Sequence, residues 1–577
     1  MTTHVIPFLA GLDPLVIEAV RARMVPVAVQ GGQTVFAQDE AGDALYLLVS
    51  GAVGVSARDA AGVVTRIARL RPPEVFGEMA LLSGAPRAAT VTALRDSQLL
   101  TLTRDAFEAV TAEHPRALLY FARMLADRLR AIYDGHLLHH GPRIFTILAV
   151  TEGPDPELFA RRLAAAFDAI LPGETGCLTE WPEGADEAWF QAFEGRHART
   201  IFAARGINAP PAPPRHRWGD HVLLLAEPGA PPRPGIGAQL EQVRSDWIRM
   251  DLVIRQSAGA RRPKPPHPAM TAFPVAMRIH VRDGRQADLD RLARLVSGTA
   301  RGLVLGGGGA RGLAHLGVLR ALDEVACPPD FVGGTSMGAI VAASLAMGWS
   351  TAEIQAQIER FFASNPINDY TLPFHALTRG AKVDAGLAAR FGGVRIEDLW
   401  LPFFCVSSNL TTGNTMVHRS GDLATALRAS IAIPGLLPPV LCDEGVLVDG
   451  GMMNNLPADI AAGLKRGPVL AIDVGTDRAF QTMPVRGWST RLVRRLIGSP
   501  PAMPGLAPLL LRAATVSGDA QSLMAAASAT AVLKPPLASI DLRAWSRFQE
   551  AAELGYRETR TSIAAGALAR WLDPPSG

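Results

Sequence analysis

Two glycine-rich turns, each placed between an apolar strand and a helix, constrain the fold of this chain more than any other feature. Leu305–Gly312 reads LGGGGARG and follows the apolar run Gly302–Leu305. Asp330–Gly338 reads DFVGGTSMG and leads into a run of small residues, Ala339–Ala346. Alternating strand and helix patterns continue beyond both turns, which favours a mostly parallel sheet flanked by helices. The sequence therefore predicts an α/β domain in this region.

The second turn has the pattern of a nucleophile elbow, GxSxG, with Ser336 between Gly334 and Gly338. Glycines two residues to either side let the backbone turn sharply and let the following helix press on the strand, so that the serine hydroxyl projects above the sheet. The helix N-terminus below favours developing negative charge. Taken alone, the motif is a modest signal, and a glycine-rich tight turn carrying a surface serine is the alternative.

The first turn supplies the context for that serine. Its glycines have no Cβ, so their backbone N–H groups can approach a substrate oxygen, and Gly307, Gly308 and Gly309 are the predicted oxyanion hole. A phosphate cradle is the rival interpretation. The loop lacks the Lys-Ser/Thr pair of a phosphate-binding P-loop, and a match to GxGxxG is common by chance.

A third element, Val446–Gly451 (VLVDGG), ends an apolar strand in Asp449, the candidate general base. A free aspartate has a pKa of about 3.9, so it needs burial or direct contact with the hydroxyl to act on a serine. Activated oxygen esters are therefore better substrates than amides. An Asp-Gly turn is the simpler reading of this motif alone. A histidine base is the other alternative, because His315, His375 and His418 lie in the same region.

The order LGGGGARG, GTSMG, VDGG resembles the patatin-like phospholipase family, whose pattern is GGGxRG, GxSxG and DGG or DGA. The resemblance extends from Arg301 to Asp473 and implies a serine-aspartate dyad without histidine, no metal and no catalytic cofactor. It also suggests that the apolar segment Ile431–Val440 lines an acyl pocket. The residues to which it assigns roles are the dyad Ser336 and Asp449, the oxyanion-hole glycines Gly307, Gly308 and Gly309, the loop supports Arg311 and Gly312, and the elbow glycines Gly334 and Gly338.

Short β-rich runs punctuated by glycine extend from Val35 to Thr103 and predict a small jelly roll, followed by a helical pattern over Arg104–Tyr133. Within them, Phe76–Ala93 (FGEMALLSGAPRAATVTA) resembles the phosphate-binding cassette of cyclic-nucleotide-binding domains. An arginine can pair with the cyclic phosphate, a glutamate can accept a bond from the ribose hydroxyl, and small residues admit backbone amides. The residues concerned are Gly77, Glu78, Arg87, Ala88 and Ala89.

The resemblance favours cyclic AMP over cyclic GMP, because Ala88 stands where readers of cyclic GMP often carry threonine. A jelly roll that no longer binds nucleotide is the alternative. Ile144–Val150 and His221–Ala226 read as buried strands with a helix over Pro156–Ile170 between them, a degenerate α/β segment without a phosphate loop.

The order of these parts resembles neuropathy target esterase and its bacterial relatives. We expect a multidomain chain with a regulatory domain at 1–133, an α/β segment at 134–260, a linker and lead-in helix at 261–300, the patatin-like domain at 301–475 and a C-terminal helical extension at 476–577.

Composition limits the partners. A chain of 577 residues is too long for a single hydrophobic core. Its 57 Lys and Arg residues against 54 Asp and Glu give a net charge of +3, which is too small to indicate a nucleic-acid partner. Four widely spaced cysteines and the lack of a leader or apolar span favour a cytoplasmic protein, with peripheral contact on the inner face of the membrane.

The predicted activity is hydrolysis of lysophospholipid or phospholipid acyl esters, with cyclic nucleotide as an allosteric ligand. A thioesterase or broad carboxylesterase is an alternative, as is a non-enzymatic nucleotide sensor that uses the hydrolase domain as an interaction platform.

Overall fold

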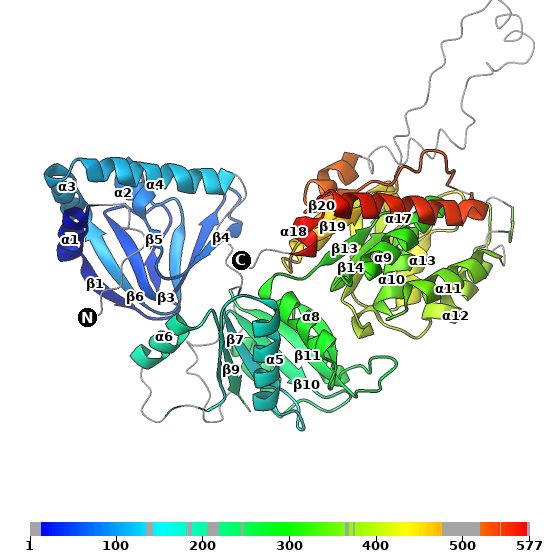
Figure 1. Cartoon of the computed structure of the whole chain (residues 1–577), viewed down its shortest axis with the longest axis horizontal. Coiled ribbons are helices and arrows are strands. Elements are labelled where there is room, and N and C mark those ends of the chain that lie inside the picture. Colours follow the sequence, from blue (N-terminus) through cyan, green and yellow to red (C-terminus); the bar gives the residue numbers. More distant parts are fainter. Residues whose placement is uncertain are drawn as a thin grey trace, which may run out of the picture.

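The computed structural model places three sheets one after another along the chain, and the second lies between the other two (Figure 1). The residues that it describes are 13–133, 142–180, 182, 187–204, 219–243, 247–363, 368–372, 375–475, 520–542 and 544–573. The resulting multidomain fold, with an N-terminal jelly roll and a C-terminal α/β domain, confirms the predicted fold class.

The first sheet is antiparallel and has the order β1-β6-β3-β4, with β2 paired to β6 and β5 to β3. Two buried apolar clusters, one around Leu45 and Leu102 and the other around Leu48 and Leu99, fill this unit. Its elements are α1 (Pro14–Arg23), β1 (Val25–Val29), β2 (Thr34–Phe36), β3 (Ala44–Arg58), β4 (Val64–Leu70), β5 (Val75–Phe76), α2 (Glu78–Ser83), β6 (Thr90–Thr103), α3 (Arg104–Glu113) and α4 (Arg116–Tyr133).

The second sheet is wholly parallel, with the order β12-β11-β10-β7-β9-β8. Helix α5 has the predicted bounds, because Asp155 caps its first amides and Pro156 occupies its first turn. The elements are β7 (Ile144–Ala149), α5 (Pro156–Ile170), β8 (Thr175–Leu178), α6 (Glu187–Arg196), β9 (Arg199–Ala204), β10 (His221–Ala226), α7 (Ile236–Val243), β11 (Arg249–Gln256), β12 (Met277–Arg282) and α8 (Gln286–Ser297).

Strand β12 lies inside the range 261–300, where the sequence suggested only a linker and a lead-in helix. It pairs with β11 in parallel and so completes the second sheet. One buried apolar cluster then runs from Phe145 of β7 through Leu292 of α8 to Val304 of the third sheet. The second and third sheets therefore share a core, and the segment between them is a structural layer of that core.

The third sheet has the order β17-β18-β15-β14-β13-β19-β20, with β16 paired to β15. Its central strands are parallel, whereas β16, β17 and β18 run antiparallel to their neighbours. Its strands are β13 (Gly302–Leu305), β14 (Phe331–Thr335), β15 (Phe403–Asn409), β16 (Asn414–His418), β17 (Val440–Cys442), β18 (Gly445–Asp449), β19 (Val469–Ile472) and β20 (Ala531–Leu533).

Helices cover this third sheet: α9 (Ala314–Glu324), α10 (Met337–Ala346), α11 (Thr351–Ala363), α12 (Ala381–Phe391), α13 (Leu423–Ser430), α14 (Ala458–Gly463), α17 (Phe548–Ala564) and α18 (Ala569–Leu572). The C-terminal extension was expected to be helical, but it also contributes β20, which pairs in parallel with β19. Residues 476–519 of that extension lie outside the described residues.

A buried histidine makes the stability of this shared core depend on pH. His280 of β12 is fully buried between Gln256 and the carbonyl of Glu397, and burial lowers its pKa to about 4. The pKa of His280 is lower in the folded state than in the unfolded state. Its contribution to the free energy of unfolding is therefore fully present above about pH 6.5 and is lost as the pH falls toward 4.

We expect the free energy of unfolding to drop by about 2 kcal/mol for this residue between pH 7 and pH 5. His280→Gln removes the titrating group and should give a shallower dependence of Tm on pH than the wild type. His375→Gln, at an exposed position, is the control. An equal pH slope in His280→Gln and wild type would contradict the assignment.

Candidate active site

Ser336 lies at the turn between β14 and α10 in a strained backbone conformation, with φ 54° and ψ −122°. Non-glycine residues adopt such angles only where the surroundings enforce them. A Cβ on Gly338 would lie 2.1 Å from the carbonyl oxygen of Leu305, and one on Gly334 would lie 2.7 Å from the same atom. Both glycines thus let the elbow and α10 pack directly on β13.

The structure brings the predicted serine and aspartate together. Ser336 Oγ donates a hydrogen bond of 2.7 Å to Asp449 Oδ2, and both side chains are buried. Asp449 Oδ1 accepts the amide of Gly451 at 2.8 Å, which orients the carboxylate. The strand register explains the meeting: Thr335 pairs with Val406 of β15, and the next residue of β15 pairs with Asp449.

Ser430, which sequence reasoning did not single out, supports the strained turn. It is the last residue of α13 and is fully buried, and its Oγ accepts the backbone amide of Ser336 at 2.9 Å. No local motif marks this serine within the segment Gly421–Pro439. Its role follows only from the packing of α13 beside the elbow.

The glycine loop lies against the elbow, but one of its three predicted donors is already engaged. The Gly307 amide donates to the carbonyl of Asn455 at 3.1 Å, and Asn455 Nδ2 donates back to the Gly307 carbonyl at 2.9 Å. A Cβ on Gly307 would lie 3.1 Å from Ser336 Cβ, so the loop closely approaches the nucleophile. The Gly307 amide is therefore engaged within the protein in this conformation, and Gly308 and Gly309 stay as the predicted oxyanion donors.

The C-terminal extension holds the other side of this loop. Arg311 is buried and donates from Nε to the carbonyl of Ile540 at 2.5 Å, and the Ala310 amide donates to the Leu542 carbonyl at 2.8 Å. A Cβ on Gly312 would lie 2.6 Å from Met337 Cγ, so this glycine lets the loop pack on α10. Arg311 thus connects the loop to the C-terminal extension, and Gly312 lets it contact α10.

None of the three candidate histidines is positioned as the catalytic base. His315 is fully buried on α9, and its Nε2 bonds to the carbonyl of Gly306 at 2.9 Å. Burial lowers the pKa of His315 to about 4, so the ring is neutral and anchors the start of the glycine loop. His418 Nε2 bonds to Ser407 Oγ at 2.8 Å, and His375 is exposed.

An apolar cavity begins beside the nucleophile. Met337, which follows Ser336, lines it together with Ile340 and Ser344 from the same face of α10. The opposite wall comes from α11, α12 and the loop before α11, and consists of Trp349, Gln357, Ile358, Phe361, Gly386, Leu387, Arg390 and Phe391. The suggested pocket segment Ile431–Val440 is not part of this lining.

In the jelly roll, the five cassette residues surround a short helix. Gly77, with φ 83°, precedes α2, which begins at the buried Glu78. Ala88 is exposed and Ala89 half-buried, immediately before β6. Arg87, between them and α2, is turned inward and only 2% exposed.

Two nitrogens of the Arg87 guanidinium bond to backbone carbonyls in this conformation. Nη1 donates to the carbonyl of Gly77 at 2.8 Å and Nη2 to the carbonyl of Ala44 at 2.9 Å. The group stacks 4.1 Å from the centre of the Phe36 ring, and burial lowers the pKa of Arg87. The arginine therefore ties the first residue of the cassette to β3.

The described residues include neither a cluster of metal ligands nor a helix that could span a membrane. Within them there is no group of three or more His, Cys, Asp or Glu side chains arranged to hold a metal ion. Across the same residues, none of the helices combines the length and the apolar character needed to cross a membrane.

Comparison with known protein families finds two matches. Residues 303–462 match the patatin-like phospholipase family, and residues 26–114 match the cyclic nucleotide-binding domain. The first match contains Ser336, Asp449 and the glycine loop, and the second contains Arg87 and the rest of the cassette. The predicted lipid ester hydrolase and cyclic-nucleotide-binding domain are confirmed at this level.

Whole-chain relatives agree with this arrangement. A lysophospholipase nte1 of Aspergillus niger is 27% identical, over 92% of this chain and 41% of its own length. A patatin-like phospholipase domain-containing protein 7 of Mus musculus is also 27% identical, over 95% of this chain and 46% of its own length. The chain thus spans less than half of these two relatives.

An uncharacterized NTE family protein of Mycobacterium tuberculosis is 30% identical over 97% of this chain and 95% of its own length. Because this match extends over nearly the full length of both chains, the protein belongs to the NTE family of patatin-like phospholipases.

Proposed function

We propose that the chain hydrolyses acyl esters of lysophospholipids or phospholipids with a Ser336–Asp449 dyad. The single observation that carries the proposal is the 2.7 Å bond from Ser336 Oγ to Asp449 Oδ2, formed at a strained elbow beneath the glycine loop. A direct carboxylate contact allows an aspartate to act as the base without an intervening histidine.

In the first half of the reaction, Ser336 Oγ attacks the ester carbonyl carbon while Asp449 accepts the hydroxyl proton. The amides of Gly308 and Gly309 hold the oxyanion of the tetrahedral intermediate. Collapse breaks the ester C–O bond, and Asp449 returns the proton to the leaving alcohol. In the second half, Asp449 takes a proton from water, which attacks the acyl-enzyme and releases the fatty acid and free serine.

The cavity beside α10 is the place proposed for the acyl chain. Met337, Ile340 and Ser344 are spaced as one helix face, so this wall extends about 10 Å along the axis from the nucleophile. Apolar side chains such as Ile358 and Phe391 form the opposite wall, and burial of methylenes there contributes about 0.8 kcal/mol each. A lipid acyl group fits this lining better than a small polar ester does.

Peripheral contact with a lipid surface, from the cytoplasmic side, completes the proposal. The hydrolase region carries large apolar side chains in open solvent: Tyr370 and Leu372 are each 72% exposed, and Leu441 is 76% exposed. Such side chains favour an interface over water.

The cyclic-nucleotide-binding domain is the proposed regulatory site, with cyclic AMP as the preferred ligand. The cyclic phosphate would replace the Gly77 carbonyl as the partner of Arg87, because an anion forms a stronger hydrogen bond with a guanidinium than a neutral carbonyl does. Binding thus breaks the bond through which Arg87 joins Gly77 to β3 and shifts the enzyme between states of different activity.

Replacement of either dyad residue tests the catalytic proposal. Ser336→Ala should lower kcat for lysophospholipid by at least about 10³-fold, and Asp449→Asn by about 10² to 10⁴-fold, because each removes one half of the proton transfer. Fatty-acid release measures both. Ser562→Ala on α17 is the matched control. Undiminished hydrolysis in either dyad variant would refute the site, and faster cleavage of an acyl thioester than of the oxygen ester would redirect the substrate class.

Asn455 is predicted to position the glycine loop. In Asn455→Ala the side-chain bond to the Gly307 carbonyl is lost, so kcat should fall by about tenfold or more while KM changes little. Steady-state kinetics and thermal unfolding separate this effect from global destabilisation. Asn368→Ala, at the surface, is the comparison. A rise in KM with kcat intact would instead give Asn455 a role in substrate binding.

Nucleotide affinity tests the cassette. Arg87→Ala should weaken cyclic AMP binding by about 10 to 150-fold, the loss expected for one or two charge-assisted bonds, whereas Arg58→Ala should leave it unchanged. Calorimetry with cyclic AMP and cyclic GMP measures both affinity and preference, and circular dichroism checks the fold. If Arg87→Ala binds cyclic AMP with the wild-type affinity, the cassette is not the nucleotide-binding site.

A further inference from the structure

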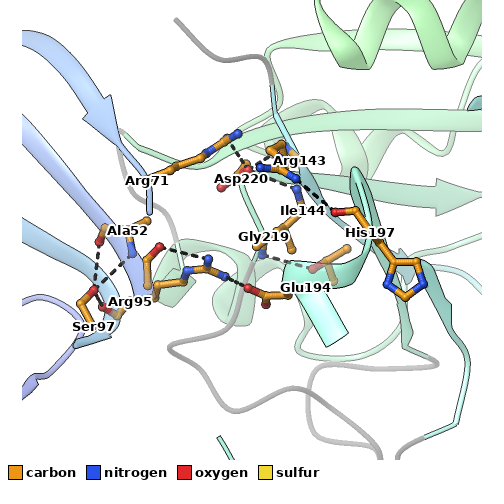
Figure 2. A network of polar contacts seen from close by, with 12 residues as sticks. Ala52, Arg71, Arg95, Ser97, Arg143, Ile144, Glu194, His197, Gly219 and Asp220 are labelled. Carbon is orange, nitrogen blue, oxygen red and sulfur yellow. Dashed lines mark hydrogen bonds and ion pairs between the residues drawn. The ribbon is translucent and has the colours of Figure 1, made fainter. Parts of the chain in front are cut away.

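The jelly roll meets the second sheet through a buried carboxylate. Asp220 accepts hydrogen bonds from the guanidinium groups of Arg69 at 2.8 Å and Arg71 at 2.6 Å, both from the jelly roll (Figure 2 draws Arg71). It also accepts the backbone amides of Arg143 at 2.8 Å and Ile144 at 3.1 Å, at the start of β7. One side chain thus binds both the jelly roll and the first residues of the second sheet.

Asp220 is only 6% exposed, and a buried charge is tolerated only with matched partners. Its guanidinium and amide partners hold the pKa of Asp220 well below the ordinary range against the effect of burial. The carboxylate therefore remains charged, and the relative position of the jelly roll and the sheet depends on these bonds.

The next residue, His221, begins β10 and connects to the hydrolase domain. His221 Nε2 bonds to Asp251 Oδ2 at 2.7 Å, and Asp251 forms two bonds of 2.6 Å with the guanidinium of Arg466. His221 and Asp251 are fully buried, and Arg466 is nearly so. Two consecutive residues, Asp220 just before β10 and His221 at its start, thus connect to the jelly roll and to the hydrolase domain respectively.

From Arg466 the connection to the glycine loop is short. The Arg466 carbonyl accepts the amide of Ala300, just before β13, and Arg466 itself lies three residues before β19. At the other end of these paired strands, the Gly306 amide donates to the carbonyl of Ile472 at 3.0 Å. The strands that Arg466 holds therefore end at the loop beside Ser336.

From Arg71 the connection to the cassette is equally short. The Arg71 carbonyl accepts the amide of Glu74, and β5 then leads directly to Gly77 and the buried Glu78. A displacement of the cassette thus reaches Arg71 within a few residues of backbone.

Trp247 provides a second contact toward the same strand. Its carbonyl accepts Arg69 Nη1 at 3.3 Å, and a Cβ on Gly54 of β3 would lie 2.7 Å from its ring. Trp247 lies two residues before β11, the strand that carries Asp251. Contacts from the jelly roll therefore converge on β10 and β11.

The two junctions differ in character. The jelly roll has apolar clusters of its own and meets the second sheet through polar bonds, whereas the second and third sheets share one buried apolar cluster. Polar junctions permit relative motion, and shared cores resist it. The second sheet thus moves with the hydrolase domain, and adjustment occurs at Asp220.

We propose that the Asp220 cluster, defined as Asp220 with Arg69 and Arg71, couples the nucleotide cassette to the glycine loop through His221, Asp251 and Arg466. This inference rests on the proposed function, and it assigns the segment 134–260 a role as the coupling unit. Nucleotide binding shifts Arg71 against Asp220, and the rigid second sheet carries the shift to β13 and β19.

A second ion pair crosses the same interface and serves as the matched control, because its arginine acts on Asp220 through charge alone and not through a bond in the route. Arg95 of β6 donates to Glu194 of α6 at 2.8 Å, also between the jelly roll and the second unit (Figure 2). Helix α6 precedes β9, on the side of the sheet opposite β11 and β12. Loss of this ion pair should weaken the contact without interrupting the route to Arg466.

The experiment compares full-length wild type, Arg71→Gln, Asp220→Asn and Arg95→Gln. Each is assayed for lysophospholipid hydrolysis with and without saturating cyclic AMP, for cyclic AMP affinity by calorimetry, and for amide hydrogen exchange across residues 302–313. We expect a wild-type change of at least about fivefold in hydrolysis, the lower range of allosteric coupling. In Arg71→Gln and Asp220→Asn, cyclic AMP should still bind with the wild-type affinity but should no longer change the rate of hydrolysis. Arg95→Gln should respond like wild type.

The outcomes separate the two proposals. If a folded Arg71→Gln variant responds to cyclic AMP as wild type does, the coupling route is overturned. It is also overturned if Arg95→Gln loses the response to cyclic AMP as completely as Arg71→Gln does. If Asp220→Asn fails to fold, Arg71→Gln, which retains the carboxylate, decides the question. Absence of hydrolysis in wild type refutes the proposed function, and nucleotide-dependent exchange at 302–313 then still tests the coupling. Absence of that exchange change in wild type overturns the coupling whatever the hydrolysis shows.

Discussion

The strained backbone of Ser336 is the constraint on which the rest of the hydrolase site depends. A left-handed φ at a serine costs on the order of 1 to 3 kcal/mol and persists only where neighbouring groups enforce it. Here the elbow glycines rest on the Leu305 carbonyl, Ser430 binds the strained amide, and α10 is made of small apolar residues that pack closely. The hydroxyl is thereby directed at Asp449, and the Gly307 segment is held beside it by Asn455.

Buried charges organise the connection between the three sheets. Asp220 and Asp251 each lie among cationic partners, and neither would be stable in the interior without them. Apolar contacts would hold two units together in many arrangements, whereas a carboxylate with guanidinium and amide partners requires one geometry. Asp220, just before β10, and His221, the first residue of that strand, serve these two requirements at consecutive positions, since Asp220 binds the jelly roll and His221 binds Asp251.

Local signals predicted much of the fold. Helix α5 was found at its bounds because a capping aspartate, a proline in the first turn and a regular apolar period all agree. Strand β12 is absent from the linker and lead-in helix that the sequence predicts for 261–300, since six residues with two arginines carry no strong strand pattern. Strand β20 was likewise missed, because three residues become a strand only through pairing with β19, about sixty residues earlier in the chain. In the site, the dyad came from motifs, whereas Ser430 and Asn455 have no motif and are defined by distant contacts.

The amino-acid sequence by itself determined which residues are candidates for the chemistry, because glycines with no tolerated Cβ, a serine at an elbow and an aspartate before two glycines mark positions whose backbone demands are local. Tertiary structure decided which glycine amide is already engaged beside Ser336, which cavity adjoins that serine and how the jelly roll connects to the hydrolase domain. These properties depend on atoms that meet across more than a hundred residues of chain, such as Gly307 with Asn455 and Arg71 with Asp220. No local pattern encodes such meetings, since they follow from strand order, register and the burial of charge.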